Sequence, residues 1–172
     1  MVKTYENFPV WMVLVTNAVA LSVYALGAAI LYGFGTGIVV LYLLYCLWVE
    51  TRVMRMSCAC CYYYGKTCGS GKGRLCALLF KKSDPKRFLE KDITFKDLLP
   101  DFMVSLLPLV GGLTLLAAGF TWSILALMTA LALLAFPGSA VMRGRIMCKY
   151  CRQREIGCPA QKLFQKKEAN TI

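Results

Sequence analysis

The fold of this chain is decided by a run without a charged side chain, residues 7–49, which reads NFPVWMVLVTNAVALSVYALGAAILYGFGTGIVVLYLLYCLWV. A second uncharged run covers residues 102–142. A bilayer core about 30 Å thick needs roughly 20 helical residues, so each run is long enough to cross it twice. Each run also has turn residues near its centre, at 33–37 and at 119–122. The sequence therefore predicts four transmembrane helices, at 8–32, 37–56, 101–119 and 122–142.

The expected fold class is an all-α integral membrane protein built of two tandem helical hairpins. Two long buried helices of a soluble protein are the alternative, but such helices normally carry a polar stripe. We expect a first hairpin at 1–57, a cytoplasmic cysteine-rich segment at 58–100, a second hairpin at 101–147 and a second cysteine-rich segment at 148–172.

The composition limits the chemistry that this chain can perform. It has 172 residues, 58% of them hydrophobic, a net charge of +11, nine Cys and no His. The lack of His excludes His-ligated haem, His-containing zinc sites and catalytic triads that need an imidazole. The two uncharged runs contain no Asp, Glu, Lys, Arg or His, and the acids Glu50 and Asp101 lie at their boundaries. A pump or proton-coupled transporter is therefore disfavoured.

The basic residues predict the orientation in the membrane. Nineteen of the twenty Lys and Arg residues lie in segments 51–100 and 143–172, and the two presumed outer turns have none. The positive-inside rule then places both termini and both basic segments in the cytoplasm, as in a multi-pass protein of the cytoplasmic membrane. In that compartment clustered cysteines more often bind metal than form structural disulfides. The inverted orientation would instead make them a disulfide scaffold.

The cysteines form an internal repeat. Two groups share the pattern C-x-x-C-x(6)-C, which is formed by Cys58, Cys61, Cys68, Cys148, Cys151 and Cys158. An Arg stands three residues before each pattern, at Arg55 and Arg145, and a Leu-Phe pair with two lysines follows each. Each pattern comes directly after a hairpin. The sequence therefore predicts an internal duplication that places both cysteine groups under the same leaflet, where they can meet.

Thiolates at this spacing suit zinc, iron–sulfur clusters and copper(I). Nearby basic residues favour an anionic thiolate site, because positive charge lowers the pKa of a thiol. We expect zinc in a mainly structural role, with an iron–sulfur cluster as the alternative; a redox or disulfide pair and unliganded thiols stay open. Six thiolates fit one shared two-metal cluster or two separate sites, and Cys60 or Cys76 offers a fourth ligand to the first group.

The repeated C-x-x-C-x(6)-C, with Arg and Lys among the cysteines, locally resembles the two-zinc, six-cysteine cluster of fungal transcription factors. The resemblance implies that Cys58 and Cys148 bridge both metals, and that Cys61, Cys68, Cys151 and Cys158 are terminal ligands. It is a resemblance of spacing only. The two halves here are separated by a membrane hairpin, so we expect no binding of nucleic acid.

Two further features concern anions and lipid. The stretch 69–74 is rich in glycine and holds Lys72 and Arg74, so it is either an anion-cradling loop or a spacer that lengthens the first repeat. With Arg55 and Arg145 these residues are the predicted anion or lipid head-group site. Residues 77–100 mix apolar and lysine residues, which predicts an interfacial amphipathic helix on anionic lipids or a solvated linker.

The function that fits these features best is a membrane metalloprotein without enzymatic activity, whose cysteine segments clamp the hairpins together or dock a protein partner or second copy. Iron–sulfur electron transfer in the membrane is the first alternative. Handling of soft metal ions and modification of lipids are weaker ones, because the helices offer few metal ligands and no evident general base.

Overall fold

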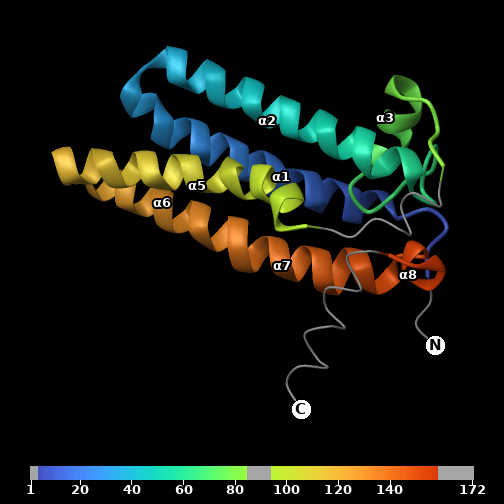
Figure 1. Cartoon of the computed structure of the whole chain (residues 1–172). Helices are drawn as coiled ribbons and strands as arrows, with labels where there is room; N and C mark the ends of the chain where they lie inside the picture. Colours follow the sequence, from blue (N-terminus) through green and yellow to red (C-terminus); the bar gives the residue numbers. More distant parts are fainter. Residues whose placement is uncertain (1–3, 85–93, 159–172) are drawn as a thin grey trace.

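The computed structural model describes residues 4–84 and 94–158, and nearly all of that part is helical. Its long elements are α1 (Val10–Leu31), α2 (Thr36–Met56), α5 (Phe95–Ala118) and α6 (Trp122–Leu133). In the described residues no strand forms, and one isolated bridge pairs Tyr5 with Cys151. Figure 1 shows the long helices side by side as two hairpins, with both hairpin turns at the same end of the molecule. The predicted all-α class is confirmed.

Four helical stretches are long and apolar enough to cross a membrane: Val10–Phe34, Thr36–Cys60, Lys96–Ala118 and Trp122–Tyr150. The first two agree with the predicted helices at 8–32 and 37–56. The turn between them consists of η1 (Tyr32–Phe34) and Gly35, whose φ of 106° is accessible to glycine at little steric cost. The four stretches are thus consistent with a multi-pass membrane protein.

The second hairpin extends beyond the predicted ends on the side opposite its turn. α5 begins at Phe95 instead of 101, because Thr94 and Asp97 form the capping box that satisfies its first backbone donors. After α6 the helix continues through η3 (Leu134–Gly138), α7 (Ser139–Val141) and η4 (Met142–Met147). Both η3 and η4 are π-helical, and η3 contains Pro137, which lacks an N–H for the regular helical pattern.

The core lies where the two hairpins pack against each other. Small residues allow close approach: a Cβ on Gly112 of α5 would lie 3.1 Å from Ile30 of α1, and one on Gly27 of α1 would lie 2.9 Å from the Pro108 ring of α5. Tyr42 is buried and donates a hydrogen bond to the Val104 carbonyl at 3.0 Å, which joins α2 to α5. Close backbones and interhelical hydrogen bonds are the typical means by which membrane helices associate.

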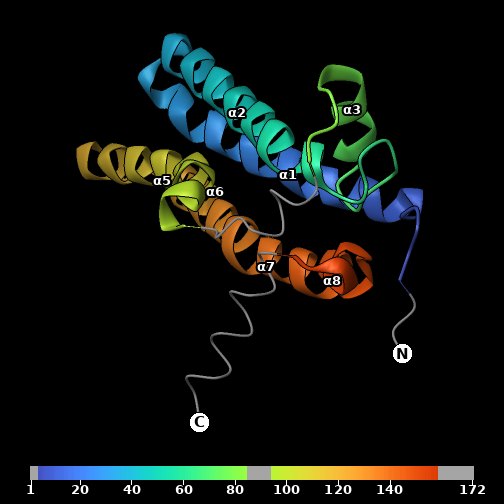
Figure 2. The same ribbon diagram turned by 45° about the vertical axis from the view of Figure 1, so that its right-hand side comes forward.

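The cysteine segments gather at the end of the bundle opposite the hairpin turns (Figures 1 and 2). The first consists of η2 (Cys58–Cys60), a loop and α3 (Lys72–Leu79); the second consists of η5 (Cys148–Tyr150) and α8 (Gln153–Ile156). We call this part, residues 57–80 and 148–158, the cysteine knob. The predicted interfacial helix at 77–100 is wrong in its bounds, because α3 already ends at Leu79 and residues 80–84 are not helical. Residues 85–93 of this predicted helix lie outside the described residues.

Candidate functional site

The two C-x-x-C stretches adopt the same local backbone. In each, a single 3-10 turn is closed by a hydrogen bond from the second cysteine to the carbonyl of the first, from Cys61 to Cys58 at 3.3 Å and from Cys151 to Cys148 at 3.4 Å. The second cysteine then leaves the turn in an extended conformation, with φ of −82° in both stretches. Each turn directly follows a membrane helix, so the two helices present their C-x-x-C stretches in the same way.

The two segments contact each other through buried polar groups. Gln153 of α8 is buried, and its Oε1 accepts the backbone N–H of Tyr62 at 2.7 Å and lies 3.7 Å from the Cys61 sulfur. The Tyr63 hydroxyl accepts the backbone N–H of Arg152 at 3.0 Å. Side chains that flank one C-x-x-C stretch therefore bind the backbone that flanks the other.

The N-terminal residues complete the cysteine knob, which the sequence analysis did not anticipate. The Tyr5 backbone donates to the Tyr150 carbonyl at 3.0 Å, and the Phe8 backbone donates to the Thr67 carbonyl at 2.9 Å. Phe8 and Tyr63 are buried, and their rings meet edge to face with centroids 5.6 Å apart. In the sequence, the one feature that indicates this role is the presence of two aromatic residues, Tyr5 and Phe8, close to the start of the first uncharged run.

The thiols of the two segments lie near one another. Burial raises the pKa of the Cys61 thiol to about 11; the backbone N–H of Tyr63 opposes the shift, and the thiols of Cys151, Cys68 and Cys158 add to it. Burial likewise raises the pKa of Cys151, opposed by the backbone N–H groups of Gln153 and Arg154 and supported by Cys148 and Cys158. In both segments the backbone N–H two positions beyond the second cysteine of C-x-x-C thus opposes the effect of burial on the pKa of that cysteine.

The third cysteine of the first group is held by the glycine-rich loop. The backbone N–H of Gly73 donates to the Cys68 sulfur at 3.4 Å, and the Ser70 hydroxyl lies 3.3 Å from it. Hydrogen bonds of this kind stabilise a thiolate and are common around metal-bound sulfur. All nine cysteines are free thiols, and Cys148 is exposed, whereas Cys58, Cys61, Cys68, Cys151 and Cys158 are half-buried.

In the described part of the chain, no three Cys, Asp or Glu side chains form a group that could hold a metal ion as they stand. The segments are thus adjacent, but their sulfurs do not converge. Of the extra candidates, Cys76 is fully buried and donates to the Met54 carbonyl at 3.4 Å, so it fastens α3 to α2. Cys60 is buried as well.

The four residues of the predicted anion site lie on three different elements, α2, α3 and η4. Lys72 forms an ion pair with Glu50, whose second oxygen accepts the Tyr24 hydroxyl, so this lysine is already neutralised. Arg74 is exposed on α3, and Arg145 is exposed on η4. Arg55 lines a notch at the end of α2.

The backbone of the glycine-rich stretch 69–74 forms hydrogen bonds within the fold. Gly71 has a φ of 73°, and its N–H donates to the Cys68 carbonyl at 2.9 Å. Asn17 of α1 donates its side-chain amide to the Ser70 carbonyl at 3.1 Å, so it binds this loop and not a neighbouring helix. Residues 69–71 therefore form the spacer between Cys68 and α3. The hydrogen bond from Asn17 to Ser70 also docks the cysteine knob on the bundle.

No protein-family model matches this chain, and comparisons with curated proteins and with solved structures find no similar protein. A function is therefore inferred from the residues and their geometry.

Proposed function

We propose that the cysteine knob is a metal centre, with zinc as the favoured ion, that clamps the two membrane hairpins together at the cytoplasmic face. The ligands are the six cysteines of the two C-x-x-C-x(6)-C patterns: Cys58, Cys61, Cys68, Cys148, Cys151 and Cys158. The protein is then a structural or partner-docking membrane metalloprotein, and the repeat is an internal duplication.

One observation carries the proposal: two separate segments bring equivalent C-x-x-C turns against each other. Their contact is direct, since Gln153 binds the backbone of Tyr62 at 2.7 Å. A backbone N–H two positions beyond each second cysteine, that of Tyr63 for Cys61 and that of Gln153 for Cys151, partly offsets the rise in pKa that burial causes. These groups favour the thiolate, which is the form of cysteine that binds metal.

Binding of a metal requires the sulfurs to converge, because no described group holds a metal as it stands. Rotation of cysteine side chains is a small change compared with moving the segments, which already touch. The metal also has to displace the thiol protons, since burial favours the neutral form of Cys61 and Cys151. Metal binding therefore releases protons.

The test is the metal content and visible spectrum of the full chain, purified anaerobically in detergent. We expect a colourless protein with about two zinc ions per chain, as six thiolates can hold. Cys58→Ser and Cys148→Ser should each remove most of the metal if these cysteines bridge a shared cluster, whereas two separate sites would lose about half. Cys46→Ala, which removes the buried thiol of the membrane core, is the matched control and should retain the metal.

Broad absorbance near 400 nm with iron and sulfide would assign the site to an iron–sulfur cluster instead. Unchanged metal content in both Cys58→Ser and Cys148→Ser, or a wild-type chain without metal, would reject the metal centre. Gln153→Ala adds a separate check of the clamp. It leaves all six thiols in place but removes one of the contacts between the segments, so it should lower metal affinity without changing the stoichiometry at saturating zinc.

A further inference from the structure

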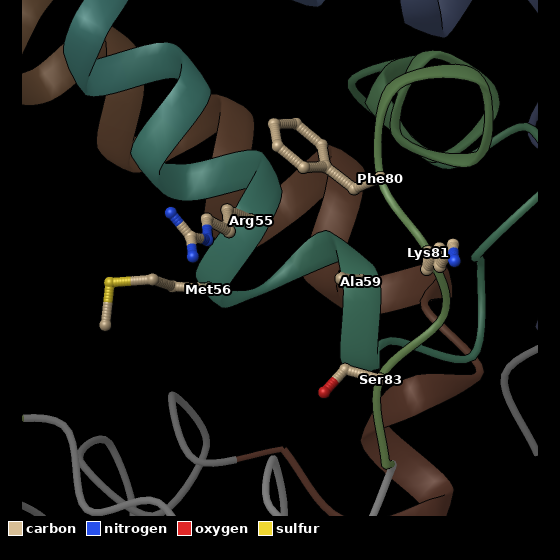
Figure 3. Close-up of a pocket in the computed structure, with 6 residues that line it drawn as sticks. All are labelled: Arg55, Met56, Ala59, Phe80, Lys81 and Ser83. Atoms are coloured by element: carbon tan, nitrogen blue, oxygen red, sulfur yellow. The ribbon is translucent and has the colours of Figure 1, made fainter.

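A shallow notch of about 420 Å³ lies where α2 ends and the chain leaves α3. Its lining residues are Arg55, Met56, Ala59, Phe80, Lys81 and Ser83. The walls are joined by hydrogen bonds: the Ser83 backbone donates to the Ala59 carbonyl at 3.0 Å, and the Tyr64 hydroxyl donates to the Phe80 carbonyl at 2.7 Å. Figure 3 shows the Phe80 ring pointing toward α2, with Ala59 between Arg55 and Lys81. The notch is therefore a built feature of the fold.

The notch is lined by two positively charged side chains, Arg55 and Lys81. Within residues 4–84 and 94–158, Arg55 and Lys81 have no carboxylate partner, and both side chains are exposed. Other cations near the bundle end are paired, Lys72 with Glu50 and Arg52 with Asp97. The Ser83 hydroxyl adds a hydrogen-bond donor to the notch. Two free cations and a hydroxyl suit the oxygens of a phosphate group.

Apolar surface continues from the notch. On α2, Met56 lines the notch and is 40% exposed. On α3, the side chains of Leu75, Leu78 and Leu79 are more than half exposed, while Gly73 and Cys76 are buried on another side of the helix. Figures 1 and 2 show α3 running across the direction of the long helices and projecting to the side of the bundle. A short helix of this kind suits the boundary between head groups and acyl chains.

We propose that this notch binds one anionic phospholipid of the adjoining leaflet, with its phosphate at Arg55, Lys81 and Ser83 and an acyl chain along Met56 and the leucines of α3. The level in the membrane fits, because the span Thr36–Cys60 ends at the notch. The end of a spanning helix lies where the lipid phosphates are. A soluble phosphate would explain the cations but not the exposed leucines beside them. This inference does not depend on the metal centre.

The test titrates the delipidated full chain in detergent with phosphatidylglycerol and, separately, with phosphatidylcholine, and counts bound lipid by native mass spectrometry. One phosphatidylglycerol molecule should bind at a concentration roughly five- to thirty-fold lower than phosphatidylcholine. One cation near an anionic lipid contributes a factor of about five, and two cations contribute a factor of about thirty. Arg55→Gln/Lys81→Gln should abolish the preference. Arg74→Gln/Lys82→Gln removes two exposed cations outside the notch and should keep it.

Equal binding of the two lipids by the wild-type chain, or an equal loss of preference in both double variants, overturns the proposal. Glycerol phosphate at millimolar concentration is the competitor that separates the two sources of phosphate. If it displaces the bound lipid completely, the notch recognises a soluble phosphate and the lipid assignment fails. Unchanged helical circular dichroism and gel-filtration profiles of both variants show that a lost preference reflects the notch and not misfolding.

Discussion

At the scale of single residues, Gly73 is the glycine packed most tightly in the cysteine knob. Its N–H donates to the Cys68 sulfur, and its carbonyl accepts the N–H of Gly65 at 3.0 Å. It also lies directly against the backbone, because a Cβ on this residue would come 2.2 Å from the Tyr63 carbonyl oxygen and 2.5 Å from that of Lys66. Those atoms belong to the turn after the first C-x-x-C stretch, which cannot move without moving Tyr63 out of the aromatic core.

Replacing Gly73 with Ala should therefore destabilise the knob by about 1–3 kcal/mol, the range for overpacking a tightly packed site. The measurement is thermal unfolding in detergent, followed by near-ultraviolet circular dichroism of the tyrosines. Gly144→Ala is the control, since a Cβ there meets nothing within 4 Å. Equal midpoints for Gly73→Ala and wild type would show that the packing around this glycine is looser than described.

The sequence pattern predicted which cysteines belong to the repeat. It could not show whether any of the remaining cysteines would serve as a further metal ligand. Cys76 lies close to the first pattern in sequence, as a fourth metal ligand would, and only the path of α3 shows that it is buried against the Met54 carbonyl. Lys72 was likewise indistinguishable from a free cation until the fold paired it with Glu50. Both roles depend on contacts between residues that are distant in sequence, which no local pattern encodes.

At the scale of elements, the helices were predictable because uncharged runs of that length have one stable solution in a bilayer. The Thr94–Asp97 capping box in the sequence marks the start of α5, but the charged residues after 142 hide helix that continues beyond the apolar core. The packing between helices depends on single small residues. Gly27 of α1 lies where a Cβ would be 2.3 Å from the Tyr42 hydroxyl of α2 and 2.9 Å from the Pro108 ring of α5.

This triple contact gives a prediction for a double-mutant cycle. Gly27→Ala should destabilise the bundle by about 1–3 kcal/mol through overpacking, and Tyr42→Phe by about 0.6–1.7 kcal/mol through loss of the hydrogen bond to Val104. The double variant should be less destabilised than the sum of the two, because removing the hydroxyl vacates part of the space that the added methyl group needs. Thermal unfolding in detergent measures the stability of the wild-type chain, the two single variants and the double variant. Strict additivity would mean that α1 and α2 are not in close contact at this point.

At the scale of the whole molecule, the two hairpins meet twice, in the membrane core and in the cysteine knob. The N-terminal residues reinforce the second contact, since Tyr5 pairs with the segment around Cys151 and Glu6 forms an ion pair with Arg152. Residues from opposite ends of the described chain thus share one small site. The repeat predicted that the two cysteine groups lie at the same end of the bundle, but the part played by the chain before α1 follows only from the three-dimensional arrangement.

The same arrangement makes the orientation of the chain decisive for its chemistry. Because all the cysteines of the knob lie at one end, they share one compartment, and that compartment decides between metal binding and disulfides. The positive-inside rule predicts that this end is cytoplasmic. Labelling of intact cells with a membrane-impermeant maleimide tests the prediction. The wild-type chain should stay unlabelled until the cells are lysed and the protein denatured, whereas Thr121→Cys, at the opposite turn, should react in intact cells. If the wild-type chain reacts from outside, the knob faces an oxidising compartment, and its paired C-x-x-C turns are then positioned to form disulfides.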